Sequence, residues 1–186
     1  MHLILYSSDG SVTQVNEQLG LPKLFHPVLT CLLVGEIDLS GLATAYATGG
    51  IVYATPETII KFENISGTRE PIIFPLVDRI GRAAAIELLI IEQVLSSDDA
   101  LSLRVIDGIM TTTAFENQAA EIIKLSRSSM TMATELVRRQ KGLTTKQAML
   151  LERYNFALRF GSTDQKEGID AFLTKRSAKF GDDDSD

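Results

Sequence analysis

Residues 28–34, Val-Leu-Thr-Cys-Leu-Leu-Val, constrain the fold of this chain more than any other segment. The run is apolar at nearly every position, so both faces of a strand formed by it would have to be buried. A strand of this kind is typical of a parallel sheet that is covered by helices. Gly35 follows the run and marks a turn. The segment therefore predicts a buried, parallel-type strand in an α/β fold.

Other segments extend this pattern into a strand-rich first part and a helical last part. We expect further strands at 2–6, 51–54, 58–62 and 104–109, and a helix over the small residues of 41–48. Apolar spacing then predicts helices over 76–93, 113–139 with a kink near 126–129, 145–160 and 163–177. The expected organisation is an α/β core at 1–110, a helical region at 111–180 and a disordered acidic tail at 181–186.

Several helix ends carry recognisable caps. Ser96 or Ser97, followed by two aspartates, is expected to open a short helix. Thr144 and Gln147 have the spacing of a capping box, and Ser162 stands in the same relation to Gln165. Gly161 can end the preceding helix in the left-handed conformation.

Composition excludes several classes of protein. The chain has 186 residues with 45% hydrophobic and 23% charged side chains, which indicates a globular chain of one domain, or one domain plus an arm. No apolar run approaches the roughly 18 residues of a membrane helix, and residues 1–6 are too short for a signal peptide. A single cysteine, Cys31, excludes an internal disulfide and suggests a reducing, cytoplasmic setting. With two histidines in the chain, we expect no metal site.

Charge is unevenly distributed along the chain. Residues 1–123 carry 6 basic and 15 acidic side chains, whereas residues 124–179 carry 12 basic and 5 acidic ones. Clustered cations raise the local concentration of anions, so the C-terminal third suggests a phosphate-bearing partner. The alternative is an ordinary solvated helical face. Nucleic acid is not expected, because the basic residues are not interleaved with aromatic ones and the net charge is −6.

Motifs for the commonest catalytic classes are absent from the sequence. It contains no phosphate-binding loop, no dinucleotide-binding glycine pattern and no nucleophile elbow. Cys31 lies within the apolar run and is expected to be a buried, unreactive thiol.

Four segments carry family-like patterns in collinear order. They are His-Pro-Val at 26–28 leading to Gly35, RIGRAAAIELL at 79–89, SSDDAL at 96–101 and KEGIDAFLTKRSAKF at 166–180. Together they resemble the crotonase family of enoyl-CoA hydratases and isomerases, whose last helix ends in an [EG]-x-x-AF-x-x-KR-x-x-x-F pattern. The resemblance implies a crotonase-like β-β-α superhelix core, truncated at the N-terminus, with a C-terminal helical trimerisation region.

The resemblance also shows departures at the site of chemistry. The family's first catalytic glutamate falls on Ala43, which cannot transfer a proton. The second oxyanion donor would be the backbone N–H of Ser40, and Gly41 follows it as a thioester-binding residue; Leu39 and Ser40 replace glycines. No segment of 7–20 matches the loop that carries the first donor.

The second catalytic glutamate of the family has two possible positions. Counting back from Gly67 gives Glu63, whereas counting forward from Tyr53 without a gap gives Asn64. Glu63 is the chemically useful one, and the alternative is an ordinary surface carboxylate at a strand end.

Binding of coenzyme A is implied at the C-terminus. Phe172 and Lys175 align with the aromatic residue and the lysine that hold the nucleotide in the family, with the ring on the adenine and the ammonium on a phosphate. Alternatively, Phe172 joins Ile169 and Leu173 in burying one face of the helix. The resemblance also implies a homotrimer or hexamer, or assembly with a full-length crotonase.

Three hypotheses follow. The first is a protein that binds a CoA or acyl-carrier thioester, with any catalysis by enolate stabilisation and one-carboxylate proton transfer, as in an isomerase or lyase. The second is an inactive homologue that acts as a structural or assembly subunit. The third is an unrelated acidic α/β binding module.

Overall fold

The computed structural model describes residues 4–6, 12–14, 30–47, 50–63, 72–122 and 124–180. It divides into two compact units, Met1–Gln118 and Ala119–Asp186. The predicted acidic tail at 181–186 and Asn64 lie outside the described residues.

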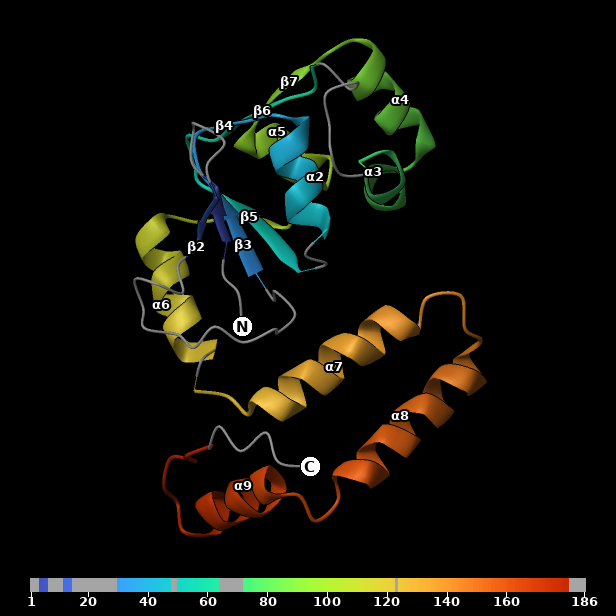
Figure 1. Ribbon diagram of the computed structural model, residues 1–186. Helices are drawn as coiled ribbons and strands as arrows, with labels where there is room; N and C mark the ends of the chain where they lie inside the picture. The colour runs from blue at the N-terminus through green and yellow to red at the C-terminus, as the bar shows by residue number, and fades with distance from the viewer. Residues whose placement is uncertain are drawn as a thin grey trace. The chain divides into compact units, whose positions relative to one another are not determined.

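The first unit is an α/β unit with two sheets (Figure 1). The larger sheet has the order β2-β1-β3-β5-β8, and the smaller one has the order β4-β6-β7. The strands are β1 (Ile4–Tyr6), β2 (Val12–Gln14), β3 (Thr30–Leu33), β4 (Glu36–Ile37), β5 (Ile51–Ala54), β6 (Ile59–Lys61), β7 (Val94–Ser96) and β8 (Gly108–Ile109). The helices are α2 (Leu39–Ala47), α3 (Ile73–Ile80), α4 (Arg82–Ile90), α5 (Ser97–Ser102) and α6 (Thr112–Ile122), which runs across the division between the units.

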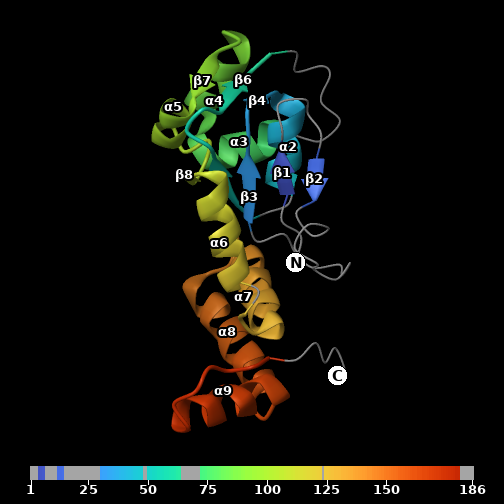
Figure 2. The same cartoon turned by 90° about the vertical axis from the view of Figure 1, so that its left-hand side faces the viewer.

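Residues 30–33 of the apolar run at 28–34 form β3, as the composition of the run predicts, and 28–29 lie outside the described residues. β3 pairs in parallel with β1 on one side and β5 on the other, and all four of its residues are buried. Cys31 and Leu33 face the core that contains Leu42 of α2, whereas Leu32 pairs with Tyr53 on the opposite face. Tyr53 meets the ring of Phe115 from α6 edge-on, with 6.3 Å between ring centroids. The large sheet is therefore covered by α2 on one face and α6 on the other (Figures 1 and 2).

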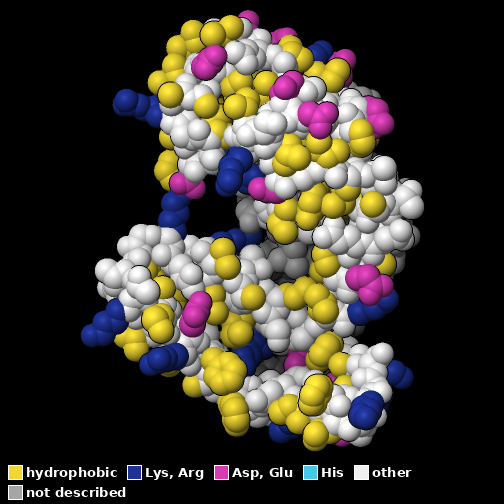
Figure 3. Space-filling view, turned by 180° about the vertical axis from the view of Figure 1, so that it is seen from behind, with side chains coloured by type: hydrophobic (Ala, Val, Ile, Leu, Met, Phe, Trp, Pro, Cys, Tyr) yellow, Lys and Arg dark blue, Asp and Glu magenta, His cyan; other side chains and the backbone are white. Residues whose placement is uncertain are grey.

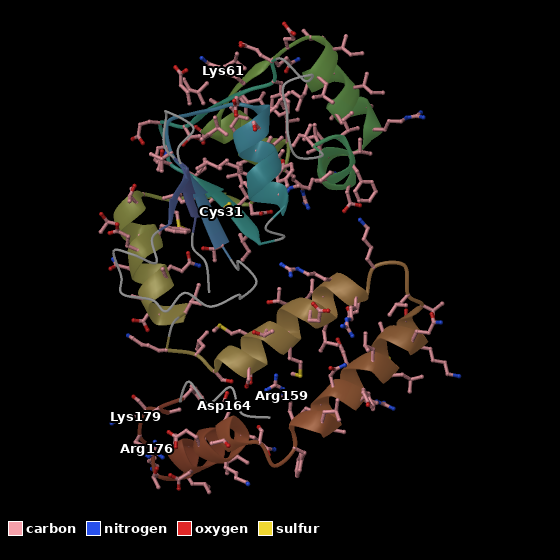
Figure 4. All side chains as sticks on the ribbon, viewed as in Figure 1. Cys31, Lys61, Arg159, Asp164, Arg176 and Lys179 are labelled. Carbon is pink, nitrogen blue, oxygen red and sulfur yellow. The ribbon has the colours of Figure 1, made fainter. Side chains whose placement is uncertain are left out.

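Cys31 lies at the centre of this core, fully buried (Figure 4). Burial raises the pKa of the Cys31 thiol to about 12, because the thiolate would lose its hydration; Asp107 adds to the rise and Arg79 opposes it. The predicted unreactive thiol is thus confirmed as a buried one.

Arg79 of α3 fastens the helical layer to the large sheet. Its guanidinium lies 5.0 Å from the centroid of the Tyr46 ring and 2.5 Å from Asp107 Oδ1. Asp107 Oδ2 in turn accepts the backbone N–H of Val52 at 2.8 Å, and the Tyr46 hydroxyl donates to the Val105 carbonyl. The arginine of the family-like segment at 79–89 therefore has a structural role, in which one side chain connects α2, α3 and β5.

The second unit is helical and contains α7 (Arg127–Arg139), α8 (Thr145–Arg159) and α9 (Thr163–Leu173). α7 and α8 form an antiparallel hairpin, and α9 is joined to the start of α7 through Asp164 (Figure 1). The Asp164 carboxylate accepts the hydroxyls of Ser126 at 2.5 Å and Ser128 at 2.7 Å. Arg159 donates to the Ser128 carbonyl at 2.7 Å, so the ends of three helices meet at this point.

The predicted caps are confirmed. Ser96 and Ser162 accept backbone N–H groups at their helix starts, and both halves of the Thr144–Gln147 capping box are present. Gly161 has a φ of 90°, in the region that favours glycine.

Several predicted boundaries are wrong, for identifiable reasons. The helix predicted over 76–93 is two helices that meet at Gly81, which has a φ of 81°, and its last residues precede β7. The helix predicted over 113–139 is two helices, α6 and α7, and the kink predicted near 126–129 is a complete break, because the Ser126 hydroxyl caps a new helix by accepting the Ser129 N–H. The helix predicted over 163–177 ends at Leu173, and only 108–109 of the strand predicted over 104–109 is extended in a sheet.

Candidate functional site

The residues expected to carry chemistry lie where β4 and β6 end. β4 and β6 are parallel, with Ile37 opposite Ile60, so the segments that leave them emerge at the same end of the small sheet. Ser40 and Gly41 lie in the first turn of α2, three and four residues after Ile37. Glu63 lies three residues after Ile60. The structure thus brings the predicted oxyanion segment and the predicted carboxylate to one end of one sheet.

The start of α2 is capped by a carboxylate. Asp38 Oδ1 accepts the backbone N–H of Gly41 at 2.8 Å, and the Asp38 carbonyl accepts the N–H of Leu42 at 3.0 Å. The Gly41 N–H is therefore already paired within the protein. Asp38 was not singled out by the sequence reasoning, although an aspartate directly before an apolar helical segment is a recognisable N-cap signal.

The cap has an electrostatic consequence for any ligand at this helix start. A helix N-terminus favours one negative charge, and Asp38 supplies one. A second unit negative charge about 4 Å from the carboxylate would meet a repulsion of about 4 kcal/mol at an effective dielectric constant of 20. An enolate oxygen at the Ser40 N–H would form in the field of this carboxylate, whereas a neutral thioester carbonyl would carry no net charge to repel.

Ala43 is part of the hydrophobic core. Its side chain is fully buried, in the same cluster as Leu42, Ala45 and Cys31. The position that the resemblance aligns with the first catalytic glutamate therefore holds a packed methyl group, which has no proton to give.

Glu63 is exposed and follows the buried Phe62. Its neighbour Lys61 forms an ion pair with Glu36 of β4, with 2.6 Å between Nζ and Oε2 (Figure 4). The pKa of Lys61 is raised, first by the hydrogen bond and charge of Glu36 and further by the charge of Glu63. Glu63 thus stands close enough to Lys61 for their charges to interact, at the rim of the sheet.

Phe172 and Lys175 lie at the end of α9, in the second unit. Phe172 is 82% exposed, and Ile169 and Leu173 are also exposed, so the alternative in which these three bury a helix face is wrong. Ala171 is the residue of α9 that is buried. Lys175 follows α9 and is exposed, with a φ of 53°. Among residues 119–122 and 124–180, no carboxylate is paired with its ammonium group.

Acidic groups do not assemble into a metal site in the part of the chain that the structure describes. Within it, no three His, Cys, Asp or Glu side chains are placed to hold a metal ion. No described helix is both long and apolar enough to span a bilayer.

Comparison with known proteins gives consistent matches. The family model for enoyl-CoA hydratase/isomerase matches residues 55–183. A Dictyostelium discoideum protein named probable enoyl-CoA hydratase, mitochondrial, is 30% identical over 169 residues, covering 84% of this chain and 58% of that protein. A Mycobacterium bovis protein named as a probable enoyl-CoA hydratase is 31% identical over 109 residues, 56% of this chain and 42% of its own length. The chain thus spans about half the length of these curated relatives.

Solved structures show the same fold. The crystal structure of an enoyl-CoA hydratase from Polaromonas sp. JS666 superimposes with a TM-score of 0.70 at 20% identity, covering 83% of this chain and 63% of that one. One from Mycobacterium smegmatis gives a TM-score of 0.66 at 23% identity, with 83% and 62% covered. The predicted α/β crotonase-like fold is confirmed.

Burial of Ala43 leads to a test of this part of the site. Replacement Ala43→Glu puts a carboxylate into a packed core, so we expect it to lower the free energy of unfolding by about 3 kcal/mol or more in urea titration. Ala83→Glu, the same change at an exposed position of α4, serves as the control and should cost less than about 1 kcal/mol. If Ala43→Glu were as stable as the control, the position would line an open site rather than the core.

Proposed function

Because the chain belongs to the enoyl-CoA hydratase/isomerase family, we propose that it binds an acyl thioester of coenzyme A, or of an acyl carrier, with its nucleotide end on α9. The proposal depends on two exposed side chains at the end of α9. Phe172 is 82% exposed, and Lys175, three residues later, is also exposed. An aromatic ring that is open to solvent can stack on adenine, and an ammonium that no described carboxylate neutralises can hold a phosphate.

The charge of the second unit supports an anionic ligand. Residues 119–122 and 124–180 carry twelve Lys or Arg and six Asp or Glu. The described residues up to Gln118 carry four and eleven. Figure 3 shows the basic side chains spread over the C-terminal helices, with apolar side chains between them. Coenzyme A carries several phosphate charges, so its nucleotide end suits the helical unit better than the acidic α/β unit.

Any chemistry would use a single carboxylate. With a methyl group at Ala43, a reaction that needs two acid–base groups lacks one of them. Glu63 can take a proton from the acyl chain and return it at another carbon, while a backbone N–H at the start of α2 holds the enolate oxygen. This sequence of steps is a double-bond isomerisation. The Asp38 carboxylate opposes the enolate, so we expect slow turnover.

Replacement Lys175→Ala tests the binding proposal. Loss of a charge-assisted phosphate contact should weaken acetyl-CoA binding about tenfold or more in calorimetric titration. Lys146→Ala removes the same charge from an exposed position of α8 and should leave affinity unchanged. Free CoA should bind in the same way as acetyl-CoA, whereas acetyl-pantetheine should be insensitive to Lys175→Ala. Absence of any binding at millimolar ligand would contradict the proposal.

Replacement Glu63→Gln tests the proton transfer. We expect it to lower kcat for isomerisation of a 3-enoyl-CoA by about a hundredfold or more while KM stays the same, because the amide cannot accept the proton. Glu57→Gln, an exposed neighbour in sequence, is the control. Unchanged turnover in Glu63→Gln would remove this residue from the mechanism.

A second candidate function is that of an assembly subunit, and α8 favours it. No residue of α8 is buried. Leu150, Tyr154 and Leu158 form an outward stripe at four-residue spacing and are 55%, 64% and 64% exposed. Such a stripe suits contact with further copies of the chain or with a longer relative. Bound thioester without turnover in the unmodified protein would favour this function over the enzymatic one.

Sedimentation equilibrium tests the assembly. We expect a mass of three or six times the 20.4 kDa of one chain. Tyr154→Glu should shift the protein toward the monomer, because it puts a charge into the apolar stripe, whereas Arg153→Glu beside it should have a smaller effect. A monomer at all concentrations, with no longer relative bound, would argue against an assembly role.

A further inference from the structure

The chain turns back sharply after α9. Thr174 ends the helix, the Lys175 N–H donates to the Phe172 carbonyl at 3.3 Å, and the Arg176 N–H donates to the Ala171 carbonyl at 3.0 Å. These two bonds form a Schellman motif, in which the residue after the C-cap adopts the left-handed conformation. That residue is Lys175, with a φ of 53°.

A lysine at this position is energetically unfavourable for the fold. Glycine is the usual residue there, because a side chain in the left-handed region costs about 1 kcal/mol or more. The chain meets the same cost at Glu92 and Arg104, which have φ values of 51° and 64°. Glu92 follows α4 in the same way as Lys175 follows α9, and it provides an internal comparison.

A clamp of charged groups holds the reversal in place. Arg176 forms two bonds to Glu167, from Nη1 to Oε1 at 2.6 Å and from Nη2 to Oε2 at 2.9 Å. Arg176 Nη2 also donates to Asp170 at 2.5 Å, and the backbone N–H of Lys179 donates to Glu167 Oε1 at 2.6 Å. The segment after α9 is therefore tied back to the middle of the helix, with Arg176 and Lys179 side by side (Figure 4).

The clamp gives two neighbouring basic residues different partners. Arg176 is neutralised by two carboxylates, whereas Lys175, at the apex of the reversal, has no carboxylate partner in the described helical unit. The Arg176 bonds lower the pKa of Glu167 to about 2, so Glu167 stays anionic and the clamp persists at neutral pH. A bidentate arginine–carboxylate pair fixes direction as well as distance.

We propose that Glu167 and Arg176 are positioning residues, which hold Lys175 in its left-handed conformation so that its ammonium and the Phe172 ring face one phosphate-bearing nucleotide. The inference rests on the proposed function, because it assigns a role to residues that support the same ligand. A strained conformation that the surrounding structure enforces is the expected mark of such a role.

A double-mutant cycle with acetyl-CoA tests this inference. Glu167→Gln keeps the size of the side chain and removes the charge, and it should weaken binding about fivefold to tenfold. In the Lys175→Ala background the same change should have no further effect, because the group that it positions is gone. Glu135→Gln, which breaks the exposed Glu135–Arg139 pair of 2.7 Å in α7, is the matched control and should not change affinity.

The outcomes separate the inference from the proposed function. Unchanged affinity in Glu167→Gln, or an equal loss with and without Lys175, would overturn the positioning role while acetyl-CoA binding by the unmodified protein still stood. Absence of acetyl-CoA binding by the unmodified protein would overturn the proposed function and the inference with it.

Glycine at the same position gives a second test that does not depend on the clamp. Lys175→Gly should raise the thermal midpoint, because it removes the left-handed side chain, and should still weaken acetyl-CoA binding about tenfold. Glu92→Gly should raise the midpoint in the same way and leave affinity unchanged. A lower midpoint for Lys175→Gly would show that the position is not strained and would overturn the argument.

Discussion

Burial of β3 on both faces is the constraint on which the rest of the α/β unit depends. Its parallel neighbours β1 and β5 satisfy the backbone, and helices must cover the two apolar faces. α2 covers one of these faces. Because α2 begins at Leu39, just after β4 ends at Ile37, its packing on the sheet also fixes the position of its first turn. The position of the candidate site follows from this packing, because α2 begins where the chain leaves β4 and runs into the core. Arg79 and Asp107 then fasten α3 to the same layer through Tyr46.

Sequence reasoning succeeded where a local pattern determines the structure. The run at 28–34, the capping box of Thr144 and the left-handed Gly161 are each decided by a few adjacent residues, and all three are confirmed. It failed at Gly81, which divides a stretch whose apolar spacing continues unbroken, and it predicted only a kink where the Ser126 cap starts a new helix. Apolar spacing shows which face of a helix is buried, and it does not show where the helical hydrogen bonds end. β7 (Val94–Ser96) was not predicted, because a strand of 3 residues leaves little pattern between the predicted helix over 76–93 and the predicted cap at Ser96 or Ser97.

The residue types of the candidate site can be proposed from the sequence, but only part of their environment can. The family pattern points to Ser40 and to either Glu63 or Asn64, and the absence of a carboxyl group at Ala43 is visible in the sequence alone. Full burial of Ala43 depends on three-dimensional packing, whereas the bond from the Gly41 N–H to Asp38 is a local N-cap that the sequence could have indicated. The partners of Arg176 were also hidden, because Glu167 lies nine residues earlier, beyond the spacing at which helical side chains meet.

Recognition and chemistry place different demands on this chain, and its residues meet them unequally. Under the proposed function, stacking and phosphate binding need an exposed ring, an available cation and a fixed backbone. The end of α9 offers the exposed Phe172, Lys175 with no carboxylate partner among residues 119–122 and 124–180, and the Glu167–Arg176 clamp. Enolate chemistry needs N–H donors whose hydrogen bonds to the substrate oxygen become stronger as that oxygen gains negative charge. At the start of α2, the negative charge of the Asp38 carboxylate opposes this stabilisation. An N-terminal carboxylate of this kind stabilises the helix in the ground state at the expense of an anionic transition state. If the proposed function holds, the two helix ends favour binding over fast turnover, so affinity and rate should be judged by separate measurements.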